Sequence, residues 1–142
     1  MRGESTTDDI YWRRVEESFR GQGVMSFLGV RLTHVARGET TVEVPYRPEL
    51  SQQLGNFQGG VIACVMDVAC GFAALTCMDP GHDVVTAEFK MNFLAPARPG
   101  LLVARGKVVR AGRLLTVSTA EGWVDETQVA LMQATMAAVR RR

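Results

Sequence analysis

The 142-residue sequence predicts an α+β fold in which an antiparallel, curved sheet wraps around one long central helix. Two observations lead to this prediction. The expected elements run in the order helix, two strands, long helix and about four strands, and runs of strands around a single helix are typical of antiparallel α+β sheets. The long helix is apolar on nearly all sides, so most of its surface must be covered.

Residues 7–20 are expected to form an amphipathic helix, because polar residues that favour helix starts precede an apolar set at helical spacing. That apolar set consists of Ile10, Val15 and Phe19. A Gly-Gln-Gly run at residues 21–23 ends the helix. We therefore expect an N-terminal helical segment, residues 1–23, and a main domain, residues 24–142.

A β-hairpin is predicted next, because two segments with period-two alternation flank a turn at Gly38. One face of the first strand is expected to consist of Val30, Leu32, His34 and Ala36. The matching face of the second strand consists of Thr40, Val42, Val44 and Tyr46. Two prolines, Pro45 and Pro48, end this strand.

The long helix is expected to begin at Gly59-Gly60 and to run to Met78, before the breaker Asp79-Pro80-Gly81. These residues contain a single charge, Asp67. The segment is long enough to span a bilayer, but a charge near the centre costs about 2.5–3.5 kcal/mol on insertion scales. No aromatic belt or basic flank brackets it. We therefore predict a buried core helix and no membrane association.

About four strands are expected after the helix. In the first, an apolar side alternates with a polar side made of Glu88, Lys90 and Asn92. The apolar side consists of Ala87, Phe89, Met91 and Phe93. The remaining strands are predicted at residues 101–110, 114–124 and 128–139.

Composition excludes several function classes. The net charge of +1 and the 22% of charged residues give no basic footprint for nucleic acid. The cysteines, Cys64, Cys70 and Cys77, are odd in number and match no zinc-ligand spacing. We expect them to be small buried hydrophobes, with no metal. Such cysteine usage without a signal peptide predicts a cytoplasmic protein.

The junction Gln58-Gly59-Gly60 is a candidate for binding a carbonyl oxygen. Glycine lets a ligand approach the backbone closely, and the first amides of a helix lack intrahelical partners and carry partial positive charge. Such amides can stabilise an oxyanion. The alternative is that the glycines only permit a tight turn and close packing.

Asp67 is the candidate catalytic carboxylate, because burying an ionised carboxylate in an apolar helix costs several kcal/mol unless it is paired. It is expected to act as a nucleophile or general base; the alternative is a structural carboxylate bonded to a neighbouring strand or lysine. Asp67 follows the candidate amides by two helical turns, about 10–12 Å of rise. One carbonyl cannot touch both groups in one chain, so we expect a homodimer with antiparallel helices and shared sites.

Residues 52–60, Gln-Gln-Leu-Gly-Asn-Phe-Gln-Gly-Gly, followed by Asp67, resemble the signature of PaaI-like hotdog thioesterases. That signature is Asn-x-x-Gly-x-x-His-Gly-Gly followed by a carboxylate on the central helix. Residues 86–97 are similar to the family's strand with its Phe-Leu-x-Pro ending. The likeness covers about residues 24–139.

The resemblance implies a hotdog fold and hydrolysis of acyl-CoA or related thioesters without a cofactor. It also implies homodimers that commonly pair into tetramers. Carried over by position, Asp67 is the nucleophile or base, and Gly59 and Gly60 supply the backbone donor. Thr86 falls where the family often has a hydroxyl that positions water. Simple strand alternation, however, groups Thr86 with the polar side of its strand.

Two positions depart from the family pattern. Gln58 replaces the frequent His, and Gln52 replaces the frequent Asn. Gln58 can still donate a hydrogen bond through its amide, as a glutamine does in some hydroxybenzoyl-CoA thioesterases of this fold, but it cannot titrate. Substrate contacts are expected from Gln52, Asn56 and Phe57, and CoA phosphates are expected to meet Arg98, Arg110 and Arg113.

The acyl group is expected to be aromatic or of medium chain length. Two other functions stay open at this point. A non-catalytic acyl-CoA-binding protein on the same fold is favoured by the replacement at Gln58. A hydratase or dehydratase ranks last, because neither His34 nor His82 is suitably spaced from Asp67.

Overall fold

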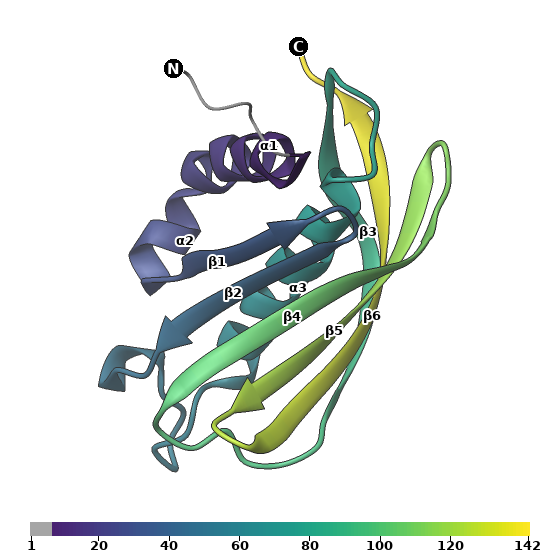
Figure 1. Ribbon diagram of the computed structural model, residues 1–142. Helices are drawn as coiled ribbons and strands as arrows, with labels where there is room; N and C mark the ends of the chain where they lie inside the picture. The colour runs from purple at the N-terminus through teal and green to yellow at the C-terminus, as the bar shows by residue number, and fades with distance from the viewer. Residues whose placement is uncertain (1–6) are drawn as a thin grey trace.

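The computed structural model describes residues 7–142 and has the predicted order of elements (Figure 1). Two helices come first, α1 (Thr7–Gly21) and α2 (Gly23–Leu28). The hairpin β1 (Arg31–Ala36) and β2 (Glu39–Pro45) and a short 3₁₀ turn (Pro48–Leu50) lead to the central helix α3 (Gly59–Leu75). The last four elements are the strands β3 (His82–Phe93), β4 (Leu101–Ala111), β5 (Leu115–Val124) and β6 (Thr127–Arg140).

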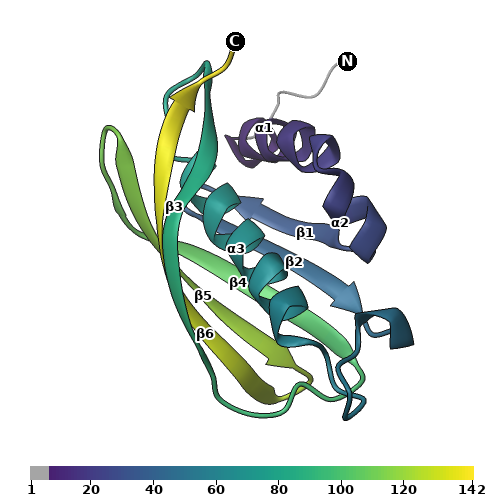
Figure 2. The same cartoon turned by 180° about the vertical axis from the view of Figure 1, so that it is seen from behind.

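The strands form one six-stranded sheet in the order β1-β2-β4-β5-β6-β3, and every neighbouring pair is antiparallel. The sheet curves around α3, which lies against five of the strands (Figures 1 and 2). Helix α1 packs beside β1. The predicted α+β architecture, a curved antiparallel sheet wrapped around one long helix, is therefore confirmed.

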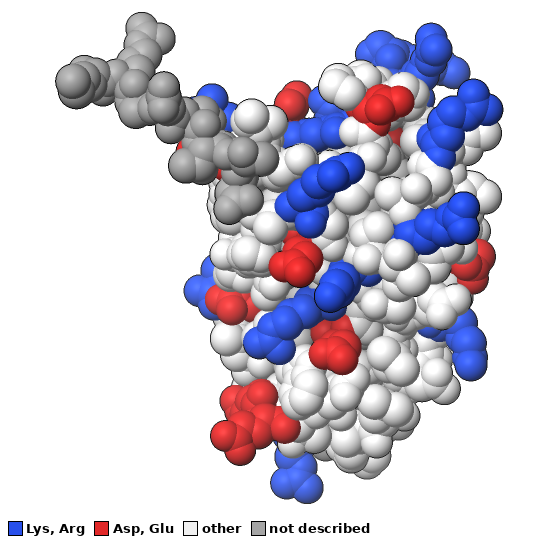
Figure 3. Space-filling view, turned by 45° about the vertical axis from the view of Figure 1, so that its right-hand side comes forward, with Lys and Arg blue, Asp and Glu red and all other residues white. Residues whose placement is uncertain are grey.

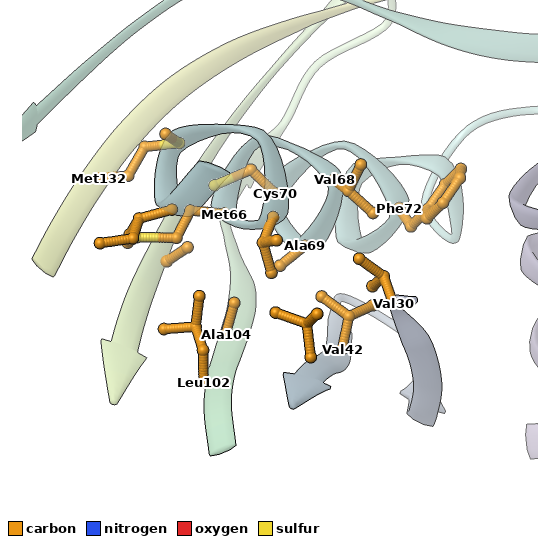
Figure 4. Packing of buried hydrophobic residues seen from close by; sticks show 14 of the residues in the cluster. Val30, Val42, Met66, Val68, Ala69, Cys70, Phe72, Leu102, Ala104 and Met132 are labelled. Atoms are coloured by element: carbon orange, nitrogen blue, oxygen red, sulfur yellow. The ribbon is translucent and has the colours of Figure 1, made fainter. Parts of the chain in front are cut away.

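The hydrophobic core lies between α3 and the concave face of the sheet. Most of the α3 side chains from Ile62 onward are buried. Val42 of β2 and Leu102 and Ala104 of β4 point toward Met66 and Ala69 of the helix (Figure 4). Alternation along β2 and β4 supplies this inward face, because successive side chains of a strand point to opposite sides.

Two glycines of the sheet allow the helix to lie directly on it. A Cβ atom built on Gly106 of β4 would stand 2.1 Å from the carbonyl oxygen of Ala69 in α3, a distance that no real side chain tolerates. A Cβ atom on Gly122 of β5 would stand 3.1 Å from the sulfur of Met66. The absence of side chains at these positions sets how deeply α3 sits in the sheet.

The predicted face of β1 is wrong in its second half. The register of β1 against β2 shifts between Leu32 and His34, which indicates a β-bulge. Beyond the bulge the alternation reverses, so Val35 is buried whereas His34 is exposed and lies 3.6 Å from Glu39. Simple period-two reasoning cannot anticipate an additional residue in one strand.

Helix α3 ends at Leu75, three residues before the predicted end. The hydroxyl of Thr76 donates to the carbonyl oxygen of Ala73 and accepts from the amide of Gly38, both at 2.7 Å. Tight turns then replace the helical pattern up to the predicted breaker. The short helix α2 was not predicted. It ends at Leu28 and is capped by Gly29, whose φ of 76° is a left-handed conformation that favours glycine.

The predicted N-terminal helix is confirmed as α1, whereas residues 1–6 of the segment 1–23 lie outside the described residues. Arg14 donates to the carbonyl oxygens of Met78 and Asp79, at 2.5 and 2.7 Å. These bonds tie α1 to the turn after α3. The proposed division of the chain at residue 23 stays a prediction.

None of the helices within residues 7–142 has the length and apolarity that crossing a membrane requires.

Replacement of Gly106 by alanine is expected to destabilise the protein, because the added methyl group collides with the α3 backbone rather than with a flexible side chain. Overpacking of this kind costs about 1–3 kcal/mol, and more where backbone must move. The free energy of unfolding from urea titration measures the effect. Gly21→Ala is the matched control, since nothing lies within 4 Å of its new Cβ atom. Equal stabilities of the two variants would contradict the proposed contact.

Candidate active site

The N-terminus of α3 presents two open backbone amides. Gln58 is the N-cap residue, and its side-chain oxygen accepts a hydrogen bond from the amide of Val61 at 2.9 Å. Its carbonyl oxygen accepts from Val61 and Ile62. Among the described residues, the amides of Gly59 and Gly60 have no acceptor, and Gly60 is exposed. A carbonyl oxygen of a ligand can therefore reach them.

The two glycines are needed for close approach and not for the turn. Neither has a positive φ. A Cβ atom on Gly60 would stand 2.8 Å from the side-chain oxygen of Gln58, and one on Gly59 would stand 3.1 Å from the ring of Phe93. The side chain of Gln58 thus folds back over the first turn of the helix. Because the side-chain oxygen of Gln58 already accepts from Val61, the side-chain nitrogen of Gln58 is the group that can donate to a ligand.

Asp67 lies half-buried on α3 and accepts a hydrogen bond of 2.7 Å from the hydroxyl of Thr86. Burial raises the pKa of Asp67 because it disfavours the charged form, and the hydrogen bond from Thr86 acts in the opposite direction. A carboxylate with a raised pKa is more basic than an ordinary aspartate when it is ionised. This is the property required of a general base or carboxylate nucleophile.

A β-bulge brings Thr86 to Asp67. Thr86 lies opposite the buried Met136 of β6, whereas Glu88 lies opposite Thr135, so Ala87 is an additional residue in β3. The hydroxyl of Thr135 donates to Glu88 on the other face of the sheet. Grouping Thr86 with the polar side of the strand was therefore wrong, because the bulge returns it to the side that faces α3.

Two cysteines lie near Asp67. Burial and then the charge of Asp67 raise the pKa of Cys64, and the same causes raise the pKa of Cys70 to about 12. Neither thiol is poised to ionise near neutral pH. Cys70 is buried as predicted, whereas Cys64 and Cys77 are only half-buried. The three-residue spacing from Asp67 on a helix could have placed Cys64 on the same face of α3.

The loop before α3 is organised by two of the predicted substrate-binding residues. The side-chain oxygen of Gln52 accepts from the amides of Leu54 and Asn56. Phe57 is buried, and its ring meets Tyr46 edge-on at 5.3 Å between ring centroids. A depression of about 450 Å³ lies between this loop, the start of α3 and the segment after β3. Gln52, Asn56 and Phe57 all line it.

The three predicted phosphate-binding arginines are not brought together in one chain. Arg98 lies in the connection from β3 to β4, at the same end of the molecule as the N-terminus of α3. Arg110 and Arg113 lie at the β4–β5 hairpin, at the opposite end (Figure 1). Figure 3 shows basic side chains over the top, centre and right of the face in view, with acidic side chains among them.

The residue spacing along α3 keeps the amides away from the carboxylate. The helix is continuous from Gly59 to Leu75. Asp67 therefore follows Gly60 by about 10 Å of rise, at 1.5 Å per residue. No group of three or more histidine, cysteine or acidic side chains arranged to hold a metal ion occurs within residues 7–142. The candidate groups are thus one carboxylate, its hydroxyl partner and a pair of helix amides.

A half-buried carboxylate with a raised pKa and a separate helix end with open amides are groups that can act on an activated carbonyl compound. Comparison with known proteins agrees. The chain belongs to the thioesterase superfamily, whose family model matches residues 54–131. It is 37% identical over 106 residues to SSO2140 of Saccharolobus solfataricus, named as an inferred esterase; the match covers 74% of this chain and 75% of that protein.

Solved structures show the same fold. A thioesterase family protein from Silicibacter pomeroyi superposes with a TM-score of 0.90 and 38% identity, over 92% of this chain and 99% of that one. The PaaI protein of the E. coli phenylacetic acid degradation operon superposes with a TM-score of 0.86 and 19% identity, over 94% and 96% of the two chains. The resemblance to PaaI-like hotdog thioesterases is confirmed, and membership of this family indicates hydrolase activity.

The substitution Asp67→Asn is expected to stabilise the folded protein at pH 8. Because burial raises the pKa of Asp67, this carboxyl favours the folded state when it is protonated, and that stability is lost as the pH rises through the folded-state pKa. An asparagine remains neutral and can still accept from Thr86. Urea unfolding across the pH range should show an advantage of the variant that shrinks as the pH falls. An advantage that grows toward acid pH would contradict the raised pKa.

Proposed function

We propose that this protein hydrolyses acyl-CoA thioesters with an aromatic or medium-chain acyl group. The observation that carries the proposal is the hydrogen-bonded pair of Asp67 and Thr86 on a helix whose first amides are open. The reaction consumes water and a thioester and yields a carboxylate and the free thiol of CoA. No cofactor is required for it.

The chain supplies groups for the charge that develops in this reaction. The amides of Gly59 and Gly60, with the side-chain nitrogen of Gln58, donate to the thioester oxygen, where negative charge accumulates as the tetrahedral intermediate forms. Asp67 either accepts a proton from the water that attacks the carbonyl carbon, with the CoA thiolate leaving, or attacks that carbon itself. Direct attack expels the thiolate and forms an anhydride, which water then hydrolyses. Both routes need the ionised carboxylate, and the hydrogen bond that Thr86 donates to Asp67 orients it.

A second copy of the chain would complete the site. The amides and Asp67 of one chain are too far apart to act on one carbonyl, but two antiparallel copies of α3 would set the amides of one against Asp67 of the other. Strand β3 supports this arrangement, because it is an edge of the sheet and exposes large apolar side chains. Of these, Val85 and Phe89 would meet the second copy. We infer a homodimer, with two dimers pairing into a tetramer.

Antiparallel packing also gives the three arginines a common role. The hairpin end of one subunit would lie near the α3 N-terminus of the other, so Arg110 and Arg113 would approach the same site as Arg98 of the partner copy. CoA carries phosphates, which guanidinium groups bind strongly. We therefore assign these three residues to the nucleotide end of the substrate.

Asp67→Asn is expected to reduce turnover by about 100-fold or more, because a positioned general base contributes on the order of 10²–10⁴-fold. Release of free thiol from a panel of aromatic and aliphatic acyl-CoAs measures the effect. Asp79→Asn, in the turn after α3, is the matched control and should retain activity. Undiminished turnover in Asp67→Asn would refute this mechanism. Saturable binding without thiol release by the wild type would instead show a non-catalytic acyl-CoA-binding protein.

Mixed dimers test whether the site is shared. Asp67→Asn and Gly60→Val each disable every site of their own homodimer, but a mixed dimer has one intact site if the amides and the carboxylate come from different subunits. Random reassortment should then restore about one quarter of wild-type activity, since half of the dimers are mixed and each has one working site. Activity no higher than that of the parent variants would place each site within one subunit. Size-exclusion chromatography of the mixture confirms that dimers have formed.

A further inference from the structure

Phe93 is placed to limit what can lie beside the open amides of α3. It is the last residue of β3, and its ring tip contacts Gly59 so closely that an added Cβ atom there would be 3.1 Å away. Phe93 as a whole is nevertheless 56% exposed. A large apolar ring thus stands at the start of the helix with one end held and its remaining surface free.

The depression of about 450 Å³ beside Phe93 is suited to an apolar group. Its inner wall contains Phe57 and Ile62, each 3% exposed, and neither can retreat because both belong to the core. Leu54 and Leu94, which are mostly exposed, form the rim. Small ligand sites have volumes of about 300–1,000 Å³ and are lined mainly by apolar side chains.

We propose that Phe93 is the specificity-determining residue for the acyl group, and that it restricts the substrates to thioesters with a compact apolar acyl group, either a single ring or a chain of no more than medium length. This inference rests on the proposed thioesterase function. A carbonyl oxygen held by the Gly59 and Gly60 amides puts the first acyl carbon at the edge of the depression. Phe93 then lies where the acyl group must pass to enter it.

The acyl group fits this depression better than the pantetheine arm of CoA does. The two amides of that arm need hydrogen-bond partners when they leave water. The lining has only two polar side chains, Gln52 and Asn56, and the oxygen of Gln52 is already bonded to two backbone amides. An acyl group without polar atoms has no such need, so its burial against Phe57 and Ile62 is favourable.

The test compares wild type with Phe93→Ala and Phe93→Trp on saturated acyl-CoAs of increasing chain length and on benzoyl-CoA. Removal of the ring should raise the ratio of kcat/KM for long chains to that for short chains by about tenfold or more, since one methylene in an apolar pocket carries about 10- to 200-fold discrimination. Phe93→Trp should shift the preference toward shorter chains. Ile10→Ala, an exposed residue of α1, is the control and should leave the ratio unchanged.

A parallel series uses N-acetylcysteamine thioesters, which lack most of the pantetheine arm. It distinguishes whether the acyl group or the pantetheine arm occupies the depression. The proposal expects the same shift in chain-length preference in both series. It is overturned if the variants change only the ratio between CoA and N-acetylcysteamine substrates, or if chain-length preference is unchanged in variants whose unfolding transitions show that they are folded. Failure of the proposed thioesterase function would look different from failure of the proposed role of Phe93. In the first case the wild type would release no thiol from any substrate.

Discussion

The close contact between α3 and the sheet at Gly106 is the constraint on which the structure depends. The carbonyl oxygen of Ala69 lies where the side chain of any other residue at this position would be. A helix in contact with bare strand backbone sits deeper than one held off by side chains, and the sheet must curve to cover its flanks. The depth of the helix in turn fixes the position of Asp67, two residues before Ala69.

The depth of α3 in the sheet determines the pKa of Asp67. A shallower helix would leave the carboxylate in water with an ordinary pKa, whereas full burial would make its ionised form too costly. The observed position is intermediate, and the hydroxyl of Thr86 partly offsets the loss of water. The carboxylate keeps one strong donor and a path to solvent at the edge of the sheet. The packing of the fold therefore sets the basicity that the proposed reaction uses.

Period-two and helical patterns were sufficient to predict the architecture, but two β-bulges were beyond them. The face of β2 follows its pattern, and α3 begins at the predicted glycine pair. In β1 and β3 an additional residue reverses the alternation, which misplaced His34 and Thr86. A bulge depends on how a neighbouring strand pairs, so the sequence of the bulged strand alone contains no clear signal for it. The capping role of Gln58 was also missed, because its side chain was considered only as a partner for substrate.

Packing and function are not rival explanations for the glycine pair at the start of α3. Gly59 admits the ring of Phe93 and Gly60 admits the folded side chain of Gln58, so each glycine is required by a neighbour within the chain. Both neighbours are side chains rather than backbone, and both are exposed. The amides beneath them belong to the backbone of α3, so their positions are fixed by the helix. A site built in this way keeps its oxyanion donors rigid and varies only the groups that surround the substrate. Substitutions at Phe93 can then alter selectivity while the catalytic geometry is preserved.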